Sequence, residues 1–253
     1  MNRRFLPLLL TIFFFFCGFL PADAKRAETL DIGGGSAAVS YLKGSAEVLG
    51  LGKASWTPLS LKDLLREGDQ VRTKAGAQME VILSDNSRLR FAGDSEFKVI
   101  RMEAGDSSTS RDVNVHVTLG KIWASVTKAT GAKGNFAISC GQAVAGVRGT
   151  VYRMNVEQDR SALVRAYDGT VEVKGGGKVV EPPKPVGPPT RVAGPKPIPG
   201  PHKVTMEEWT VIIKAMQQVR IGADGVPEKA RDFTVEEDRD DWVEWNKARD
   251  REI

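Results

Sequence analysis

Residue types that could carry chemistry are scarce in this 253-residue chain, which contains two Cys and two His. Cys17 lies in an apolar stretch near the N-terminus, so Cys140, His116 and His202 are the soft ligands that remain. A structural zinc site needs about four Cys or His ligands, and an internal disulfide needs two cysteines. The aspartates of the expected turns lack the spacing of a calcium loop. The sequence therefore predicts no metal site, no disulfide and no cofactor, and it argues against haem and iron–sulfur ligation.

One enzyme chemistry stays open, a pair in which His116 would activate the thiol of Cys140. Against it, Cys140 continues the strand pattern after Phe136 and Ile138, where a buried small apolar residue is usual. A Cys–His hydrolase also needs a third group that orients the base, and no motif marks one. The alternation along residues 113–119 places His116 on a solvated strand face. We therefore predict that the protein is not an enzyme, with a Cys-dependent hydrolase as the weaker alternative.

The N-terminus has the pattern of an export signal. Two arginines precede an apolar run over residues 5–20, and Ala-Asp-Ala at 22–24 offers small residues to a signal peptidase. The run is shorter than the roughly 20 residues of a membrane span. We expect cleavage after Ala24, with a retained anchor as the alternative, and a periplasmic or extracellular location. Membrane contact would then be limited to the signal peptide before cleavage.

Composition divides the chain into five parts. They are a signal peptide (1–24), a flexible lead-in (25–36), a β-rich body (37–178), a proline-rich linker (179–203) and an acidic tail (204–253). Nine of the thirteen prolines fall between residues 182 and 201, which predicts extended polyproline II there. The tail carries 13 acids and 8 bases, whereas residues 25–203 carry 26 bases and 18 acids. Body and tail could meet each other or different partners, and the scattered bases argue against nucleic acid.

The body alternates apolar and polar residues with a period of two, as half-buried strands do. We predict strands at 39–49, 70–73, 78–84, 88–92, 96–102, 112–119, 121–127, 135–139, 150–157, 161–167 and 170–174. Short strands separated by frequent turn signals indicate an all-β body.

Two turns can be predicted from the requirement that residues opposite each other on paired strands face the same side of the sheet. A two-residue hairpin loop at Asp168-Gly169 would place Arg165 opposite Glu172. Near residue 85 a two-residue loop fails, because it would set apolar residues opposite arginines. A three-residue loop, 85–87, instead pairs Leu83 with Leu89 and Val81 with Phe91.

Two capping boxes predict helices in the tail. Thr205 with Glu208 opens the first, whose apolar residues recur at helical spacing and which Gly222 can end. Thr234 with Glu237 opens the second, which has only two tryptophans as an apolar stripe. Such a helix is marginal alone and needs a surface, which could be the body or another protein.

Two stretches of the body together contain an ordered series of short motifs. The first, from residue 65 to 91, contains Gly-Asp followed by Arg-Thr and then an acid, a turn and Ser; the second, from 119 to 173, contains Val-Arg-Gly-Thr and a closing Gly-x-Val. The residues that carry these motifs are Gly68, Asp69, Arg72, Thr73, Asp85, Ser87, Arg148, Gly149, Thr150 and Gly169. Together the motifs resemble the FecR domain, a family named after the regulator of ferric-citrate uptake.

The resemblance covers residues 37–175 and implies an extracytoplasmic, all-β domain of stacked antiparallel layers, either a short solenoid or a flattened sandwich. It implies no chemistry of its own and a function through protein contacts. In regulators of the family, the domain relays a receptor signal to a cytoplasmic anti-sigma segment. Only four residues precede the apolar run here, so we expect no such segment.

These observations predict a non-catalytic, exported cell-envelope protein that acts as a protein-binding or sensing module. Its partner would be an envelope protein or an anionic wall polymer, reached through a strand edge or the basic face. The alternative is a structural surface scaffold or adhesin. For Arg148 we favour a bridge between layers over contact with an acidic partner.

Overall fold

The computed structural model describes residues 32, 35–104, 111–128, 134–175 and 209–252. The predicted signal peptide, nearly all of the lead-in and the proline-rich stretch therefore lie outside the described residues. The same is true of His202 and of the first predicted capping box, Thr205 with Glu208.

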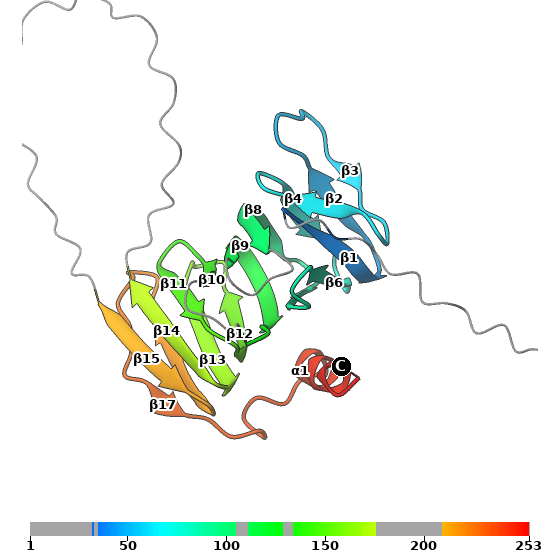
Figure 1. Ribbon diagram of the computed structural model, residues 1–253. Coiled ribbons are helices and arrows are strands. Elements are labelled where there is room, and N and C mark those ends of the chain that lie inside the picture. The colour runs from blue at the N-terminus through cyan, green and yellow to red at the C-terminus, as the bar shows by residue number, and fades with distance from the viewer. Residues whose placement is uncertain (1–31, 33–34, 105–110, 129–133, 176–208, 253) are drawn as a thin grey trace, which may run out of the picture.

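Two β-sheets packed against each other form the molecule (Figure 1). Their strands are β1 (Ser36–Lys43), β2 (Ala46–Leu49), β3 (Thr57–Pro58), β4 (Leu64–Arg66), β5 (Gln70–Thr73), β6 (Gln78–Leu83), β7 (Arg88–Ala92), β8 (Glu96–Ala104), β9 (Arg111–Ser125), β10 (Gly134–Ser139), β11 (Ala143–Val147), β12 (Val151–Val156), β13 (Ala162–Asp168), β14 (Thr170–Gly175), β15 (Thr210–Lys214), β16 (Gln217–Ile221) and β17 (Arg231–Asp232). Sheet A has the order β4-β1-β6-β7-β9-β12-β13-β16-β17. Sheet B has the order β3-β2-β5-β8-β9-β10-β11-β14-β15. The all-β prediction is confirmed, with β9–β10 as a parallel pairing within otherwise antiparallel layers.

Strand β9 belongs to both sheets. Residues 111–119 pair with β8 in sheet B, and residues 120–125 pair with β12 in sheet A. The strand bends at Gly120, whose φ is +103° and whose added Cβ would lie 2.3 Å from Ser95 Oγ. Glycine is thus the residue that fits the bend. The two strands predicted at 112–119 and 121–127 are one strand that changes layer.

One apolar core fills the space between the sheets. Phe91 of sheet A stacks on Phe97 of sheet B with ring centroids 3.7 Å apart. Along β9, Val113, Val115 and Val117 are at most 1% exposed, while the residues between them face outward. The predicted period of two is therefore confirmed on this strand, and it sends every second residue into the core.

The turn at Asp168-Gly169 is not the predicted hairpin. Strand β13 pairs with β12 and β16 in sheet A, whereas β14 pairs with β11 and β15 in sheet B. Arg165 therefore lies opposite Arg153 and Gln218 instead of Glu172. In a hairpin and in a bend between layers, the same alternate residues face the core. The alternation of apolar and polar residues therefore could not distinguish a hairpin from a bend.

The β6–β7 hairpin has a three-residue loop, but not at the predicted residues. Val81 lies opposite Leu89, and the Leu83 N–H donates to the Ser87 carbonyl at 2.9 Å, which makes residues 84–86 the loop. Asn86 closes it with a φ of +63°, a conformation that Asn tolerates better than most residues. The predicted odd length is right. The register is shifted by two residues, which leaves every side chain on its predicted face.

The first predicted tail helix is wrong, because residues 210–221 form strands β15 and β16. Val211 and Ile213 pair with β14 in sheet B, and Val219 and Ile221 pair with β13 in sheet A, so the two strands extend both layers and are joined by a bend between them. The apolar residues there satisfy a period of two as well as a helical spacing, and sheet pairing decides between them.

The residues on either side of the proline-rich stretch are hydrogen-bonded to each other. The Gly175 N–H donates to the Trp209 carbonyl at 3.0 Å, and Lys174 lies opposite Thr210 on the neighbouring strand. The two described residues that flank the proline-rich stretch therefore lie side by side, at the ends of neighbouring strands of sheet B.

The helix α1 (Asp241–Asp250) ends the described chain. Its N-cap is Asp240, whose Oδ1 accepts from the Val243 N–H at 2.7 Å. The second predicted capping box does form, with Thr234 and Glu237 exchanging two hydrogen bonds of 3.2 Å, but in a turn that precedes the helix. Within the described residues, no helix combines the length and apolar character that a membrane crossing requires.

Candidate functional site

Gly68 and Asp69 shape the turn that leads into β5. The φ of Gly68 is +92°, and a Cβ there would lie 2.9 Å from Leu51 Cδ1. Asp69 Oδ2 accepts from the Arg66 N–H at 2.8 Å, the usual use of Asp in a turn. Both residues therefore serve the local backbone.

Arg72 and Thr73 also have contacts within the fold. The Arg72 guanidinium donates to Glu47 Oε2 at 2.6 Å and lies over the Trp56 ring, 4.2 Å from its centroid. Thr73 Oγ1 donates to the Ala92 carbonyl at 2.6 Å. These residues connect neighbouring strands and are not among those that line the groove described below.

Asp85 and Ser87 join the β6–β7 turn to both ends of β9. The Asp85 carboxylate accepts from Ser87 Oγ at 3.0 Å and from Arg111 Nη1 at 2.9 Å. Ser87 Oγ accepts from the Thr127 N–H at 3.1 Å, and the Thr127 carbonyl accepts from Arg111 Nη1 at 3.0 Å. Because β9 bends at residue 120, Arg111 and Thr127 meet at the same end of the sandwich.

Gly149, Thr150 and Gly169 pack against the same end. Thr150 exchanges backbone hydrogen bonds of 3.0 and 3.1 Å with Val126. The φ of Gly149 is +70°, and an added Cβ would lie 2.7 Å from Lys128 Cα. At Gly169 an added Cβ would lie 2.9 Å from the Gly149 carbonyl oxygen. The two glycines therefore allow a close approach of three chain segments.

These turns border a groove of about 800 Å³. It is lined by the start of β9 and by residues of β10, β11, β14 and β15, among them Arg111, Arg148, Glu172 and Ile212. Among the described strands, β15 is the last one of sheet B, and its Ile212 is 58% exposed. The structure thus gathers six of the ten motif residues around one end of the sandwich.

The rim of the groove is basic. Arg148 and Lys128 are exposed, and neither makes an ion pair or side-chain hydrogen bond with another described residue. The bridge that we favoured for Arg148 is therefore not seen among the described residues, and Arg111 makes such a bridge instead. Two cations with unused donors can hold a carboxylate or another anionic group.

Cys140 and His116 do not form a pair. Cys140 is fully buried, burial raises the pKa of its thiol, and its neighbour Ser139 faces the opposite side of the sheet. The hydroxyl of Ser139, and not the thiol, lies 3.2 Å from His116 Nδ1. Burial and the charge of Lys98 lower the pKa of His116, which keeps its ring neutral at pH 7. The nucleophile–base pair of the enzyme alternative is absent from this arrangement.

A second set of charged residues lies on the outer face of sheet A. Paired positions on seven neighbouring strands form a row, which we call the charged row: Tyr41, Glu80, Arg90, Trp123, Arg153, Arg165 and Gln218. Side chains on the outer face of an antiparallel sheet are commonly solvated. Here Glu80, Arg90 and Arg153 are at most 4% exposed, because the C-terminal segment (residues 234–250) covers them.

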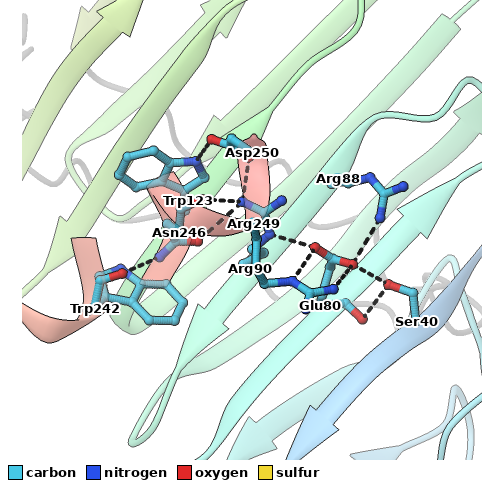
Figure 2. Close-up of polar contacts among 9 residues, drawn as sticks. All are labelled: Ser40, Glu80, Arg88, Arg90, Trp123, Trp242, Asn246, Arg249 and Asp250. Atoms are coloured by element: carbon cyan, nitrogen blue, oxygen red, sulfur yellow. Dashed lines mark hydrogen bonds and ion pairs between the residues drawn. The ribbon is translucent and has the colours of Figure 1, made fainter. Parts of the chain in front are cut away.

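Figure 2 shows how α1 meets one half of the charged row. Glu80 accepts from Arg90 Nε at 2.6 Å and from Arg249 Nη2 at 3.2 Å. Arg90 Nη1 and the Trp123 indole N–H donate to the two carboxylate oxygens of Asp250, at 2.6 and 2.9 Å. Burial opposes the charge on Glu80, but the hydrogen bonds from Arg249 and Arg90 outweigh it and lower the pKa to about 2.

Asp238 neutralises the other half of the row. It is 4% exposed and accepts from Arg153, Arg165 and the Tyr167 hydroxyl. Besides these polar contacts, Trp242 of α1 packs with Trp123 of the row in a small apolar cluster that is separate from the main core. Acidic tail and basic body therefore meet each other, which was one of the two possibilities that the charge distribution left open.

No sequence motif marks Arg90 and Arg153 as members of a site. Arg90 and Arg153 each stand between two core residues of a strand, as any solvated residue of a half-buried strand does. Only the excess of acids in the tail signals that these positions are covered.

Comparisons with known proteins agree with the motifs. Residues 69–172 match the family model described as FecR protein, so the predicted resemblance is confirmed over this span. No curated protein matches the chain. Two crystal structures described as a "putative anti-sigma factor" from Parabacteroides distasonis ATCC 8503 are similar, at 14% and 15% identity and TM-scores of 0.44 and 0.43. Each alignment covers 64% of this chain and 59% of the solved chain.

Proposed function

Because residues 69–172 form a FecR domain, we propose that this chain is a non-catalytic, exported cell-envelope protein whose β-sandwich binds a partner protein as a sensing or regulatory module. The single observation that carries the proposal is Arg148. It lies exposed at the rim of the groove, is held by turns that other motif residues build, and has no ion pair within the described structure.

The chemistry of the groove indicates what it binds. Arg148 and Lys128 offer donors to carboxylates, and the exposed Ile212 offers an apolar contact beside them. Strand β15 pairs with β14 alone among the described strands of sheet B, and an edge strand can pair with an extended segment of a partner. An acidic, extended protein segment suits all three features better than a wall polymer, which has no apolar group for Ile212.

The test is capture of the partner from the cell envelope by crosslinking to the tagged, full-length chain. The chain recovered there should begin at Lys25, as cleavage after Ala24 requires. Arg148→Glu should reduce capture at least about tenfold, because charge reversal turns attraction for a carboxylate into repulsion. Lys229→Glu is the matched control. It makes the same charge change at an exposed residue that does not line the groove, and it should leave capture unchanged.

Three results would contradict this proposal. Equal capture by the Arg148→Glu variant would remove the groove from the binding surface. A captured partner that resists protease but disappears when the cell wall is digested enzymatically would be an anionic wall polymer and not a protein. Large assemblies of the purified chain in light scattering would favour the scaffold or adhesin alternative.

A further inference from the structure

The C-terminal segment covers the charged row without becoming part of sheet A. From Thr234 onward, no backbone–backbone hydrogen bond joins this segment to a described strand. The contacts with the row are mostly made by side chains, chiefly the carboxylates of Asp238 and Asp250. A covering of this kind resembles a bound ligand more than an added strand.

The segment leaves part of the charged row unsatisfied. Arg153 is 4% exposed and donates through Nη2 to Asp238, but its Nε and Nη1 have no hydrogen-bond partner among the described residues. The same holds for Nη2 of Arg90, which is fully buried. A buried donor without an acceptor costs free energy. An occupant with carboxylates at these positions would therefore bind the row better than the chain's own segment does.

The main core does not depend on this covering. The apolar contacts of the segment form a small cluster around Trp123, Trp242 and Val243, apart from the core between the sheets. The two sheets can therefore stay packed when the segment leaves the row.

We propose that the charged row is a recognition surface for an acidic segment of a partner protein, and that residues 234–250 occupy it until such a segment displaces them. Three carboxylates show the chemistry of the occupant: Asp238 on Arg153, Asp240 on Lys121 and Asp250 on Arg90. None of the residues in the row lines the groove, so this inference is independent of the proposed function.

Covalent attachment sets the threshold for displacement. A tethered segment acts at an effective concentration of about millimolar, so a free acidic segment competes only if it binds more tightly. The unsatisfied donors of Arg153 and Arg90 allow this tighter binding, because a free segment can supply acceptors that the chain's own segment lacks. They make the charged row selective for such a segment.

The experiment uses a fluorescent peptide with the sequence of residues 233–252 as the probe and the full-length chain as the receptor. The double variant Asp238→Asn/Asp250→Asn weakens the intramolecular contact and leaves the row intact. It should bind the probe at least about tenfold more tightly than the wild-type chain, measured by fluorescence anisotropy. Added salt should weaken this binding. The matched control is the same peptide carrying both Asn substitutions, which should not bind.

A second variant covers the case in which the Asn substitutions fail to free the row. Asp238→Lys/Asp250→Lys repels the segment from the arginines, and circular dichroism checks that its sheets are retained. Failure of both variants to bind the probe, or equal binding of the probe and the control peptide, would overturn the proposal. A wild-type dimer with exchanged C-terminal segments would also overturn it, because a second copy would then be the occupant.

Discussion

At the scale of single residues, the most consequential group is the carboxylate of Glu80. Its side chain is 1% exposed and accepts from three arginines and from Ser40. A buried ion pair of this kind is weak support for stability as a whole, but removal of one partner leaves buried charges without compensation. Glu80 therefore has an effect on the fold that no exposed carboxylate of the chain should have.

Replacement of Glu80 by Gln should lower the free energy of unfolding at pH 7 by about 3 kcal/mol, since three arginines then lose a buried carboxylate and Arg90 keeps only Asp250 as an anionic partner. The pKa of Glu80 is about 2 in the folded state and ordinarily 4.5. Its ionised form therefore stabilises the fold above about pH 4.5, and this contribution is lost as the pH falls toward 2. Urea unfolding should show the gap between wild type and Glu80→Gln narrowing steadily from pH 5 to pH 3.

Glu236→Gln is the matched control for this measurement, because Glu236 is exposed and precedes the helix without an ion pair among the described residues. It should change the unfolding free energy by less than about 0.5 kcal/mol at either pH. A gap for Glu80→Gln that stays constant down to pH 3 would show that the arginine neighbours do not lower the pKa of Glu80 in the folded state.

At the scale of the elements, the turns hold the two layers together at the groove. Gly149→Ala should lower the free energy of unfolding by about 1–3 kcal/mol, because alanine is strained at a φ of +70° and its Cβ would meet Lys128. Gly141→Ala is the control: its Cβ would meet no atom within 4 Å. It should change stability by less than about 0.5 kcal/mol. Thermal unfolding followed by circular dichroism separates the two, and equal effects would contradict this account of the turn.

The sequence predicts the elements better than their connections. Strands β5 and β7 have the predicted bounds, because alternating apolar residues and flanking turn signals are local properties. The strands β3, β4 and β17 were missed because two or three residues are too few to show a period, and β11 was missed because its sequence AVAGV contains no polar residue that would show an alternation. The inter-layer bend at Gly169 and the strands β15 and β16 depend on pairing with other strands of the two sheets, which local patterns do not report.

The same limit applies to the candidate sites. The motif residues Gly149, Thr150 and Gly169 could be named in advance from the resemblance, but their assembly around a groove depends on the bend of β9. Arg111 and the charged row carried no signal of their own. Their roles come from partners far away in the sequence, such as Asp85 for Arg111 and Asp250 for Arg90.

At the scale of the whole molecule, the C-terminal segment closes one outer face while the groove stays accessible at one end of the sandwich. If both proposals hold, the molecule has one binding surface that is open and one that its own acidic residues fill. Both surfaces carry basic residues, which contribute to the charge asymmetry between residues 25–203 and the tail. On the two proposals, part of this excess of bases would serve recognition at two places on one sandwich.

The hydrogen bond between the two residues that flank the proline-rich stretch has a consequence for where the chain can be cut. Since Gly175 and Trp209 are hydrogen-bonded neighbours, a nick between them would separate two polypeptides without parting any strand from its described partners. An engineered protease site at residues 190–194 should yield fragments that co-elute in gel filtration and melt as one unit, within a few degrees of the intact protein. Fragments that fall apart would show that continuity of the chain, and not strand pairing, retains β15–β17 and α1. Reconstitution from the two pieces would make this position a natural place for a split reporter or for new termini in a circular permutant.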